Sequence, residues 1–278
     1  MTIKFKVPAT SANLGIGFDC MGIAFNLYNF FEIKEANNWI FEGFIEEEIK
    51  KNNLFLKSYL KAAKYKKIKA KPLLVKLKSN IPMCGGLGSS SSLIVAGIYA
   101  FNLINNNCLN KDEIFKIALS IEKHPDNIAP AIYGGLCIIN NNEIMKIKIS
   151  NKWHFGLWIF NYYINTEKAR NIIKKEISID DAVNNVSSAL FVLKALEDFD
   201  IANIKKIMND KIHEPYRKKL IKKFNIYKKM ALQNGALAFV ISGSGSACLS
   251  ISDKDLSIKE NDFKYINVKI DKDGVRNV

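Results

Sequence analysis

Hydrophobic and polar positions in the first half of the chain predict strands and helices that follow one another closely. Residues 2–8 and 23–35 are expected to be strands, joined by a glycine-rich turn at 15–22. Residues 52–65 are expected to form a helix. Residues 72–79 alternate apolar and polar side chains, which is typical of a half-buried strand.

A buried helix is predicted next, because residues 89–104 are apolar on nearly all sides. Asn110 or Asp112 is expected to cap a further helix that runs to about Lys123. Residues 135–149 favour a β-hairpin.

The pattern starts again after about residue 150, which predicts a second lobe. Helices are expected at 167–176, 180–197, 201–209 and 215–233, and strands at 155–160, 235–241, 247–252 and 265–270. Runs of helices between antiparallel-looking strands indicate an α+β fold. We therefore predict two lobes, residues 1–150 and residues 151–278.

The composition fits a folded protein and excludes collagenous, disordered and low-complexity chains. The 278 residues are 48% hydrophobic and 24% charged, with 15 Gly and 6 Pro. The N-terminal sequence has no long apolar segment of the kind found in secretory signals. No stretch reaches the roughly 18 apolar residues of a membrane span. We expect a cytoplasmic protein without a membrane partner.

The net charge of +14 raises the question of nucleic-acid binding. Of the 41 basic residues, 38 are Lys and 3 are Arg, and the lysines are scattered through the chain. A footprint on a phosphate backbone would favour clustered Arg and Lys. We therefore expect a solvated lysine-rich surface and no nucleic-acid partner, although the positive field would attract a polyanionic small molecule.

The cysteines and histidines indicate neither a disulfide framework nor a zinc site. The cysteines are odd in number and widely spaced, without a C-x-x-C pair, and the three histidines lack metal-ligand spacing. Most of the thiols are expected to be buried. The cysteines are Cys20, Cys84, Cys108, Cys137 and Cys248.

A glycine- and serine-rich loop between the strand at 72–79 and the helix at 89–104 is the candidate phosphate site. Its glycines allow backbone N–H groups to approach an anion, and the first N–H groups of the helix lack partners and carry partial positive charge. A glycine-rich turn with a serine cap is the structural alternative. The sequence contains no Walker A loop, protein-kinase set or dinucleotide fingerprint. The loop residues are Pro82, Met83, Cys84, Gly85, Gly86, Leu87, Gly88, Ser89, Ser90, Ser91 and Ser92.

Three other strings occur with this loop, and together the four resemble the motifs of the GHMP kinases, the family of galactokinase, homoserine kinase and mevalonate kinase. They are PATSANLG-I-GFD (8–19), EKHPDN (122–127) and ISGSG (241–245). Longer strings, VPATSANLGIGFDCMG, HPDNIAPAIYGG and HEPYRKKL, are similar to the homoserine kinases within that family. The chain departs from the family pattern at Ile16, Lys123 and Ser246, and the Lys123 change weakens the role given to Glu122.

The resemblance implies an N-terminal lobe of ribosomal-protein-S5-like fold and a C-terminal ferredoxin-like lobe. It implies that ATP and Mg²⁺ bind, that the loop wraps the triphosphate, and that Ser90 and Glu122 lie near the metal. The implied reaction is phosphorylation of the side-chain hydroxyl of L-homoserine, a step of threonine biosynthesis. The oligomeric state stays open, with a homodimer among the options.

An amino acid acceptor needs partners for its carboxylate and its ammonium. Arg binds a carboxylate with two parallel hydrogen bonds, which Lys cannot imitate. Arg170 and Arg217 match carboxylate-binding positions of the homoserine kinases, whereas Arg276 is expected to lie outside the site. A surface ion pair is the alternative for the first two. Asp19 is the expected ammonium partner, or else a turn carboxylate bonded to its own backbone.

The remaining candidates orient the acceptor. Asn13 and Asn127 are expected to contact it, with a capping role as the alternative for Asn13. Thr166 is either a substrate donor or a helix N-cap. His124, which precedes Pro125 and is expected to be extended, either bonds the acceptor or braces the loop, whereas His154 and His213 are expected to be structural.

The expected chemistry is in-line transfer of the γ-phosphoryl group, in which positioning and charge stabilisation carry most of the catalysis. A general base supplies about 10²–10⁴-fold, so it is helpful without being obligatory. Asn127 is predicted to orient the hydroxyl, and Asp126 is the candidate base. The alternatives are a mevalonate-type kinase of the same family and an S5-like RNA-binding protein.

Overall fold

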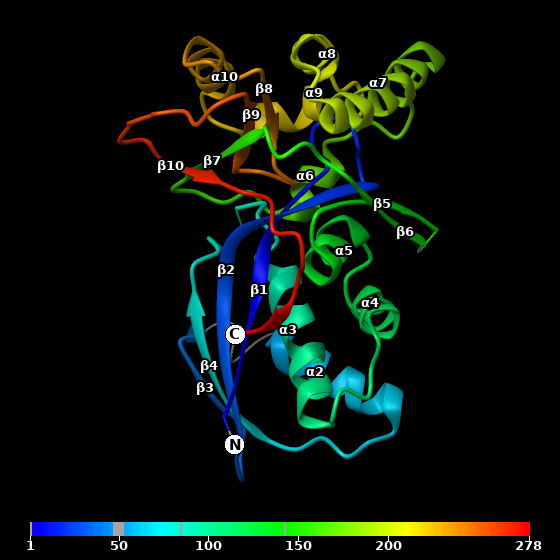
Figure 1. The fold of residues 1–278 in the computed structure, drawn as a ribbon, viewed down its shortest axis with the longest axis vertical. Coiled ribbons are helices and arrows are strands. Elements are labelled where there is room, and N and C mark those ends of the chain that lie inside the picture. Colours follow the sequence, from blue (N-terminus) through cyan, green and yellow to red (C-terminus); the bar gives the residue numbers. More distant parts are fainter. Residues whose placement is uncertain (1, 47–52, 84, 142) are drawn as a thin grey trace.

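The computed structural model describes residues 2–46, 53–83, 85–141 and 143–278, and it contains two sheets stacked end to end (Figure 1). The seven-stranded first sheet has the path β11-β1-β2-β4-β3, with β5 paired to β2 and β6 paired to β5. Its strands are β1 (Ile3–Ala12), β2 (Met21–Glu35), β3 (Ile40–Glu42), β4 (Leu73–Ser79), β5 (Leu136–Asn140), β6 (Glu143–Ile147) and β11 (Arg276–Asn277).

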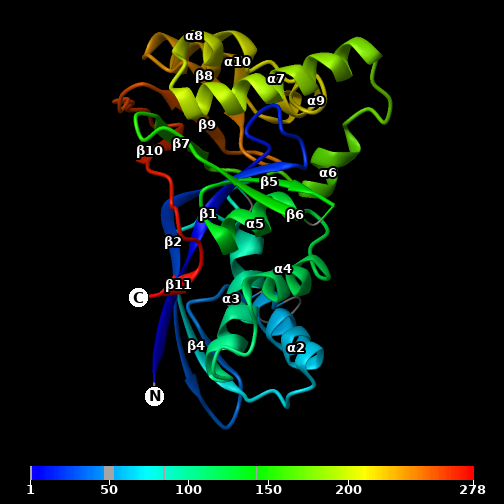
Figure 2. The same cartoon turned by 45° about the vertical axis from the view of Figure 1, so that its right-hand side comes forward.

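Helices cover one face of the first sheet (Figure 2). The inward side chains of β1, β2 and β4 pack with them in one apolar cluster that includes Phe5, Phe31 and Phe55. This is the pattern of a largely antiparallel sheet buried on one side, although β3 runs parallel to β4. These helices are α2 (Leu54–Lys66), α3 (Ser89–Ile104), α4 (Lys111–Leu119) and α5 (Pro125–Tyr133).

The second sheet has the order β10-β7-β9-β8, with every neighbour antiparallel. Counted along the chain this is 4-1-3-2, the strand order of a ferredoxin-like fold. The strands are β7 (His154–Phe160), β8 (Ala238–Ile241), β9 (Cys248–Ser252) and β10 (Phe263–Val268). The helices of this lobe are α6 (Thr166–Asn171), α7 (Ile179–Asp198), α8 (Ile201–Ile207), α9 (Glu214–Arg217), the 3₁₀ turn η1 (Lys218–Leu220) and α10 (Phe224–Gln233).

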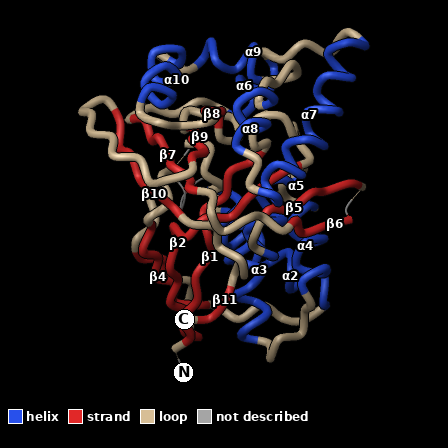
Figure 3. Tube along the Cα trace, turned by 45° about the horizontal axis from the view of Figure 1, so that its top comes forward, coloured by secondary structure: helices blue, strands red, loops and turns tan. Residues whose placement is uncertain are grey.

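The two lobes share apolar core. One cluster joins Leu14 and Phe25 from the first lobe to Leu157, Val240 and Leu249 from the second. After β10 the chain returns to the first sheet, where β11 lies beside β1 (Figure 3). The division at residue 150 therefore separates the sheets except for this last strand, and it stays a prediction as a domain boundary.

Most predicted elements are present, and the α+β class is confirmed. Asn110 is the cap of α4, with its side chain accepting from Glu113 N at 2.8 Å. The helix expected to reach about Lys123 ends at Leu119, and a turn at 120–121 separates it from His124, which is extended before Pro125. The short strand β3 and the helix α5 were not predicted.

The single helix predicted over 215–233 is wrong. Ile221 is extended and Lys223 has a left-handed φ of 58°, so the chain leaves helical geometry between η1 and α10. The helix predicted over 167–176 ends at Asn171. None of the helices within the described ranges combines the length and the apolar character that crossing a membrane requires.

Candidate active site

A cavity of about 340 Å³ lies where the two lobes meet, and it gathers most of the predicted site residues. Its lining from those predictions is Asn13, Gly85, Gly86, Gly88, Ser89, Ser90, Ser91, Glu122, His124, Asp126, Asn127, Thr166, Arg170 and Arg217. All four strings therefore contribute, since Gly243 and Ser244 also line it.

The predicted phosphate loop needs glycine at two positions. Gly86 and Gly88 have φ values of +78° and +71°, the left-handed region that favours glycine. A Cβ at Gly86 would lie 2.2 Å from the carbonyl oxygen of Ser242, and one at Gly88 would lie 2.0 Å from Oγ1 of Thr10. Helix α3 then starts at Ser89 without a side-chain cap, so its N-terminal end stands at the cavity.

The string around Gly243 holds this loop from the second lobe. Ser242 Oγ lies 2.7 Å from the carbonyl oxygen of Gly86 and 2.8 Å from Ser11 Oγ. The N–H of Ala247 donates to Gly85 O at 2.9 Å. Residues 241–245 therefore join the phosphate loop to the second lobe. These contacts account for the glycine and serine residues of this string without a contact to substrate.

Part of the predicted loop does not line the cavity. Leu87 is buried in the shared apolar cluster, and Ser92 is buried with its hydroxyl bonded to Ser89 O and Asn29. Pro82 and Met83 are also absent from the lining, and Cys84 lies outside the described residues. Leu87 and Ser92 serve the packing of the loop and of α3, because their side chains are turned into the protein.

Asp19 does not line the cavity itself, but it forms an ion pair with Arg170, which does. Both terminal nitrogens of Arg170 donate to the carboxylate, at 2.9 and 2.7 Å. Burial acts to raise the pKa of Asp19, but the bonds and charge of Arg170 outweigh it and hold that pKa below its usual value. Asn13 supports the turn, since its Oδ1 accepts from Asp19 N at 3.0 Å.

Arg217 is buried, and the backbone fixes it. Its Nε donates to Ala169 O at 3.0 Å and its Nη1 to Gly243 O at 2.9 Å. Burial and the nearby charge of Arg170 lower the pKa of Arg217 to about 10. The ring of Phe18 lies 5.1 Å from the Arg217 guanidinium and 5.7 Å from that of Arg170. Two cations at one cavity create a place for an anion.

Asp126 and Asn127 lie in the first turn of α5, which starts at Pro125. Asp126 is 3% exposed, and burial together with the charge of Asp19 raises its pKa to about 7. Oδ1 of Asn127 accepts from Thr10 Oγ1 at 2.7 Å, which leaves the amide nitrogen for the cavity. The sequence reasoning missed Thr10, although it lies inside one of the quoted strings.

Of the remaining candidates, His124 and Thr166 line the cavity, whereas Arg276 lies outside it. His124 is extended, as predicted, and its Nδ1 lies 3.8 Å from Asp19. Thr166 is not a helix cap, because Asn165 occupies that position and accepts from Lys168 N. Thr166 Oγ1 instead lies 3.4 Å from Ser244 Oγ. Arg276 pairs with Asp271 and is absent from the cavity lining.

The described part of the chain holds no metal site built from protein ligands alone. Within the described ranges no group of three or more His, Cys, Asp or Glu side chains could hold an ion. Ser90 and Glu122 both line the cavity. One hydroxyl and one carboxylate suit Mg²⁺ when substrate phosphates complete the shell.

Comparison with known proteins agrees with this geometry. The family model "GHMP kinases N terminal domain" matches residues 53–135, and "GHMP kinases C terminal" matches residues 192–260. A homoserine kinase from Clostridium botulinum is 38% identical over 290 residues, covering 98% of this chain and 97% of the relative.

Two solved structures share the whole fold. The homoserine kinase of Cytophaga hutchinsonii superposes with a TM-score of 0.87 at 25% identity, covering 100% of this chain and 97% of that one. A putative homoserine kinase from Listeria monocytogenes gives a TM-score of 0.82 at 26% identity, covering 100% and 99%. Four matching strings, one shared cavity and a full-length relative lead to one assignment. The chain belongs to the homoserine kinases of the GHMP kinase family.

Proposed function

We propose that this protein transfers the γ-phosphoryl group of ATP to the side-chain hydroxyl of L-homoserine. The observation that carries the proposal is one cavity that is lined together by the phosphate-type loop, by Arg170 and Arg217, and by Asp126 and Asn127. The curated relative, named as a homoserine kinase over nearly the same length, supports the same reaction.

The triphosphate would lie against the loop at 85–91 and the start of α3. Backbone N–H groups at a helix N-terminus favour anions, and the first turn of α3 carries no acidic side chain. Mg²⁺ would be held by Ser90, Glu122 and the phosphates, where it would neutralise charge on the transferring group. Glu122 is fixed for this role by its Oε1, which accepts from His124 N at 3.2 Å.

A zwitterionic acceptor complements the charged end of the cavity. Its carboxylate would bind Arg170 and Arg217, and its ammonium would face Asp19. The existing Asp19–Arg170 pair supports this arrangement, because an amino acid offers each partner the opposite charge that it already prefers. Mevalonate lacks an ammonium and would leave the Asp19 carboxylate without a new partner.

The acceptor hydroxyl would be oriented by the amide nitrogen of Asn127, whose direction Thr10 fixes. Asp126 is the group able to take the hydroxyl proton, because a carboxyl group with a pKa near 7 is partly ionised at neutral pH. Transfer itself depends mainly on bringing the hydroxyl in line with the γ-phosphate, which can contribute about 7–11 kcal/mol. His124 and Thr166 would complete the acceptor contacts.

The decisive experiment measures ADP release with ATP and Mg²⁺ over a panel of L-homoserine, mevalonate and galactose. Release that depends on L-homoserine alone is expected. Turnover of mevalonate at a comparable kcat/KM, without turnover of L-homoserine, would replace the proposed acceptor. Salt-sensitive RNA binding without any ADP release would favour the nucleic-acid alternative.

We further propose that the chain forms a homodimer through α7. This helix, at the outer surface of the second lobe (Figure 2), exposes apolar side chains at spacings of four, three and four residues. Such spacing forms one continuous stripe, as in a coiled coil. The stripe is Ile179, Val183, Val186 and Leu190, exposed by 81, 61, 64 and 65%.

A second copy fits this stripe when the two helices run antiparallel. Val183 and Val186, in the middle of the stripe, would then face Val186 and Val183 of the partner subunit. Val186→Asp should convert the dimer to a monomer in analytical ultracentrifugation. Ile226→Asp, at an exposed apolar position of α10, is the matched control. A monomeric wild-type protein at micromolar concentration would refute the pairing.

A further inference from the structure

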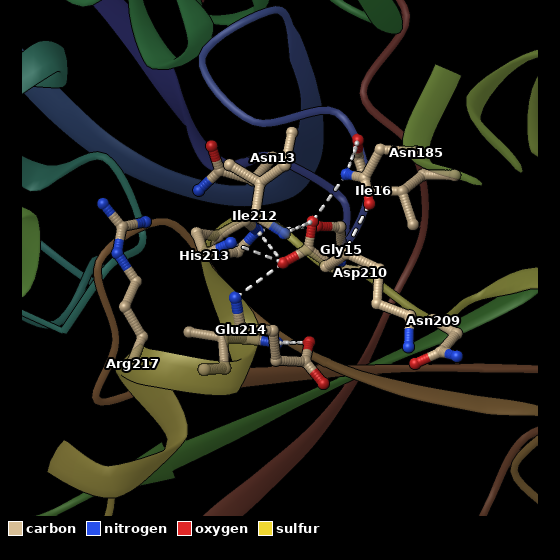
Figure 4. Close-up of polar contacts among 12 residues, drawn as sticks. Asn13, Gly15, Ile16, Asn185, Asn209, Asp210, Ile212, His213, Glu214 and Arg217 are labelled. Carbon is tan, nitrogen blue, oxygen red and sulfur yellow. Dashed lines mark hydrogen bonds and ion pairs between the residues drawn. The ribbon is translucent and has the colours of Figure 1, made fainter. Parts of the chain in front are cut away.

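Asp210 is a buried carboxylate that lies behind the cavity wall and does not line the cavity. Figure 4 shows it at the centre of a compact set of polar contacts. It accepts from Asn185 Nδ2 at 2.8 Å and from the N–H groups of Ile212, His213 and Glu214 at 3.2, 2.7 and 2.6 Å. Its contacts come from two separate elements, α7 and the start of α9.

These bonds fix the segment that carries Arg217. Asn185 also accepts from Lys211 N at 2.8 Å, so one side chain of α7 bonds two consecutive residues just before α9. The N–H of Arg217 donates to His213 O at 2.9 Å, one helical turn later. The place of the Arg217 guanidinium therefore depends on where Asp210 holds the start of α9.

His213 connects the start of α9 to the first lobe. Its ring is fully buried, and its Nε2 lies 2.6 Å from the carbonyl oxygen of Gly15. Because a carbonyl only accepts, Nε2 must carry the proton of this bond. Burial lowers the pKa of His213, and the Asp210 carboxylate, 3.8 Å from Nε2, opposes this shift. The Nδ1 atom of the ring has no partner within the described part of the chain.

The carbonyl of Gly15 belongs to the turn that presents the acceptor-side residues. Phe18 stacks on the His213 ring at 5.2 Å, and the same Phe18 ring lies beside both site arginines. Asp19 follows Phe18 directly. A shift of the Gly15 carbonyl would therefore move the Asp19 carboxylate and the apolar support of the arginines together.

We propose that Asp210 and His213 are positioning residues that set the acceptor half of the site, by fixing Arg217 on one side and the turn at 13–19 on the other. The inference rests on the proposed function, because it assigns this half of the cavity to L-homoserine. The hydrogen bonds of Asp210 and His213 within the described ranges go to other segments than the loop at 85–91, so neither residue bonds the nucleotide half directly and their effect should fall mainly on the acceptor half.

A merely structural role predicts something different. Loss of stability lowers the fraction of active enzyme, and it changes kcat without separating the two substrates. A positioning role raises KM for one substrate alone. The readouts are therefore KM for L-homoserine, KM for ATP and the melting temperature, measured on the full chain for each variant.

The variants are Asp210→Asn, His213→Leu and His213→Gln. Asp210→Asn keeps the shape but turns an amide N–H toward backbone donors. His213→Leu removes the bond to Gly15, whereas His213→Gln keeps an N–H able to reach it. Asp200→Asn is the matched control, because Asp200 caps α8 with Asn203 by similar geometry away from the cavity.

Asp210→Asn and His213→Leu should each raise KM for L-homoserine by at least about fivefold, with KM for ATP within about twofold of wild type. In His213→Gln, KM for L-homoserine should stay close to that of the wild type. In the double variant Asp210→Asn/His213→Leu, the increase in this KM should be less than the two single effects combined. Asp200→Asn should lower only the melting temperature. Should Asp210→Asn fail to fold, the Leu and Gln variants at His213 carry the comparison.

Equal increases in both KM values, or an unchanged KM for L-homoserine in His213→Leu, would overturn the inference. Wild-type protein that releases no ADP with L-homoserine would instead overturn the proposed function, so the two failures are distinguishable.

Discussion

At the scale of single residues, Arg170 and Arg217 differ in what their guanidinium groups already bind. Arg170 is paired with a carboxylate, whereas Arg217 donates to two carbonyls and is buried. A lysine cannot reach both carbonyls. We expect Arg217→Lys to raise KM for L-homoserine by about 10–100-fold, the equivalent of a lost charged hydrogen bond of about 1.5–3 kcal/mol. Arg170→Lys should act in the same direction by less.

Steady-state kinetics with each substrate varied checks this expectation. Arg276→Lys is the matched control, since Arg276 pairs with the buried Asp271 and lies outside the cavity. KM for ATP should move little in all three variants. An unchanged KM for L-homoserine in both site variants would contradict carboxylate binding by these arginines.

Asp126 predicts a pH dependence of both activity and stability. Its pKa rises on folding from 3.8 to about 7, so between these values the folded chain holds a proton that the unfolded chain has lost. The contribution of Asp126 to stability therefore falls as the pH rises through this window, and its penalty is complete above about pH 7. Asp126→Asn should stabilise the protein at pH 8 by on the order of 2 kcal/mol and should change little at pH 4.

Activity gives the second readout for Asp126. Wild-type kcat should rise with pH toward about 7 as the carboxylate ionises, and Asp126→Asn should lose this limb. A fall in kcat of far more than about 10⁴-fold in the folded variant would mean that a base is indispensable. Urea denaturation at the two pH values measures the stability part.

At the scale of elements, the approach of β1, the loop and α3 depends on Gly88. Its φ is +71°, and a Cβ added there would lie only 2.0 Å from Thr10 Oγ1, which leaves no space for a side chain. Gly88→Ala should therefore displace Thr10 and the Asn127 that it holds, and should lower kcat/KM for both substrates by about 10²-fold or more. Gly235→Ala, at φ +99° where a Cβ would make only ordinary contacts at 3.6 Å, tests backbone strain without a clash. Equal activity of the two variants would show that close packing at Gly88 is unimportant.

The elements also show how far the sequence carries. The pattern of apolar positions predicted β1, β2, β4, α3 and the hairpin of β5 and β6: β4 alternates apolar and polar side chains, and α3 is apolar on nearly all sides. The break near Ile221 and Lys223 was missed, since neither residue excludes a helix and the bend is set by tertiary contacts. Helix α5 was missed because Pro125 and Pro130 suggest a loop, although Pro125 occupies its first position and Pro130 is accommodated inside it.

At the scale of the whole molecule, the sequence identified the residues that line the cavity better than the residues that hold them in place. The four strings named the cavity residues because side chains in contact with substrate are restricted in type. They did not identify Thr10 as the partner of Asn127, nor Asp210 behind Arg217, since each acts through a second residue. Ser92 and Leu87 were grouped with the loop, and only the fold reveals that they point into the protein. Contacts between residues that are distant along the chain can be identified only from the three-dimensional structure.

The shared core makes a prediction about the unfolding of the whole molecule. One apolar cluster contains residues of both lobes, and β11 ties the C-terminal end to the first sheet, so the lobes should unfold together. Trp39 reports on the first lobe, where it packs on Tyr59, and Trp158 reports on the second, where it packs on Phe263.

The experiment follows tryptophan fluorescence during urea unfolding in two variants, one that keeps only Trp39 and one that keeps only Trp158. The two midpoints should agree once each is corrected for the variant's own stability, measured by circular dichroism. Leu249→Ala, at a fully buried position of the shared cluster, should shift both curves by an equal amount, on the order of 2–5 kcal/mol. If that substitution moved the Trp158 curve and left the Trp39 curve in place, the lobes would be independent folding units, and the cavity between them would depend on docking that either lobe can lose alone.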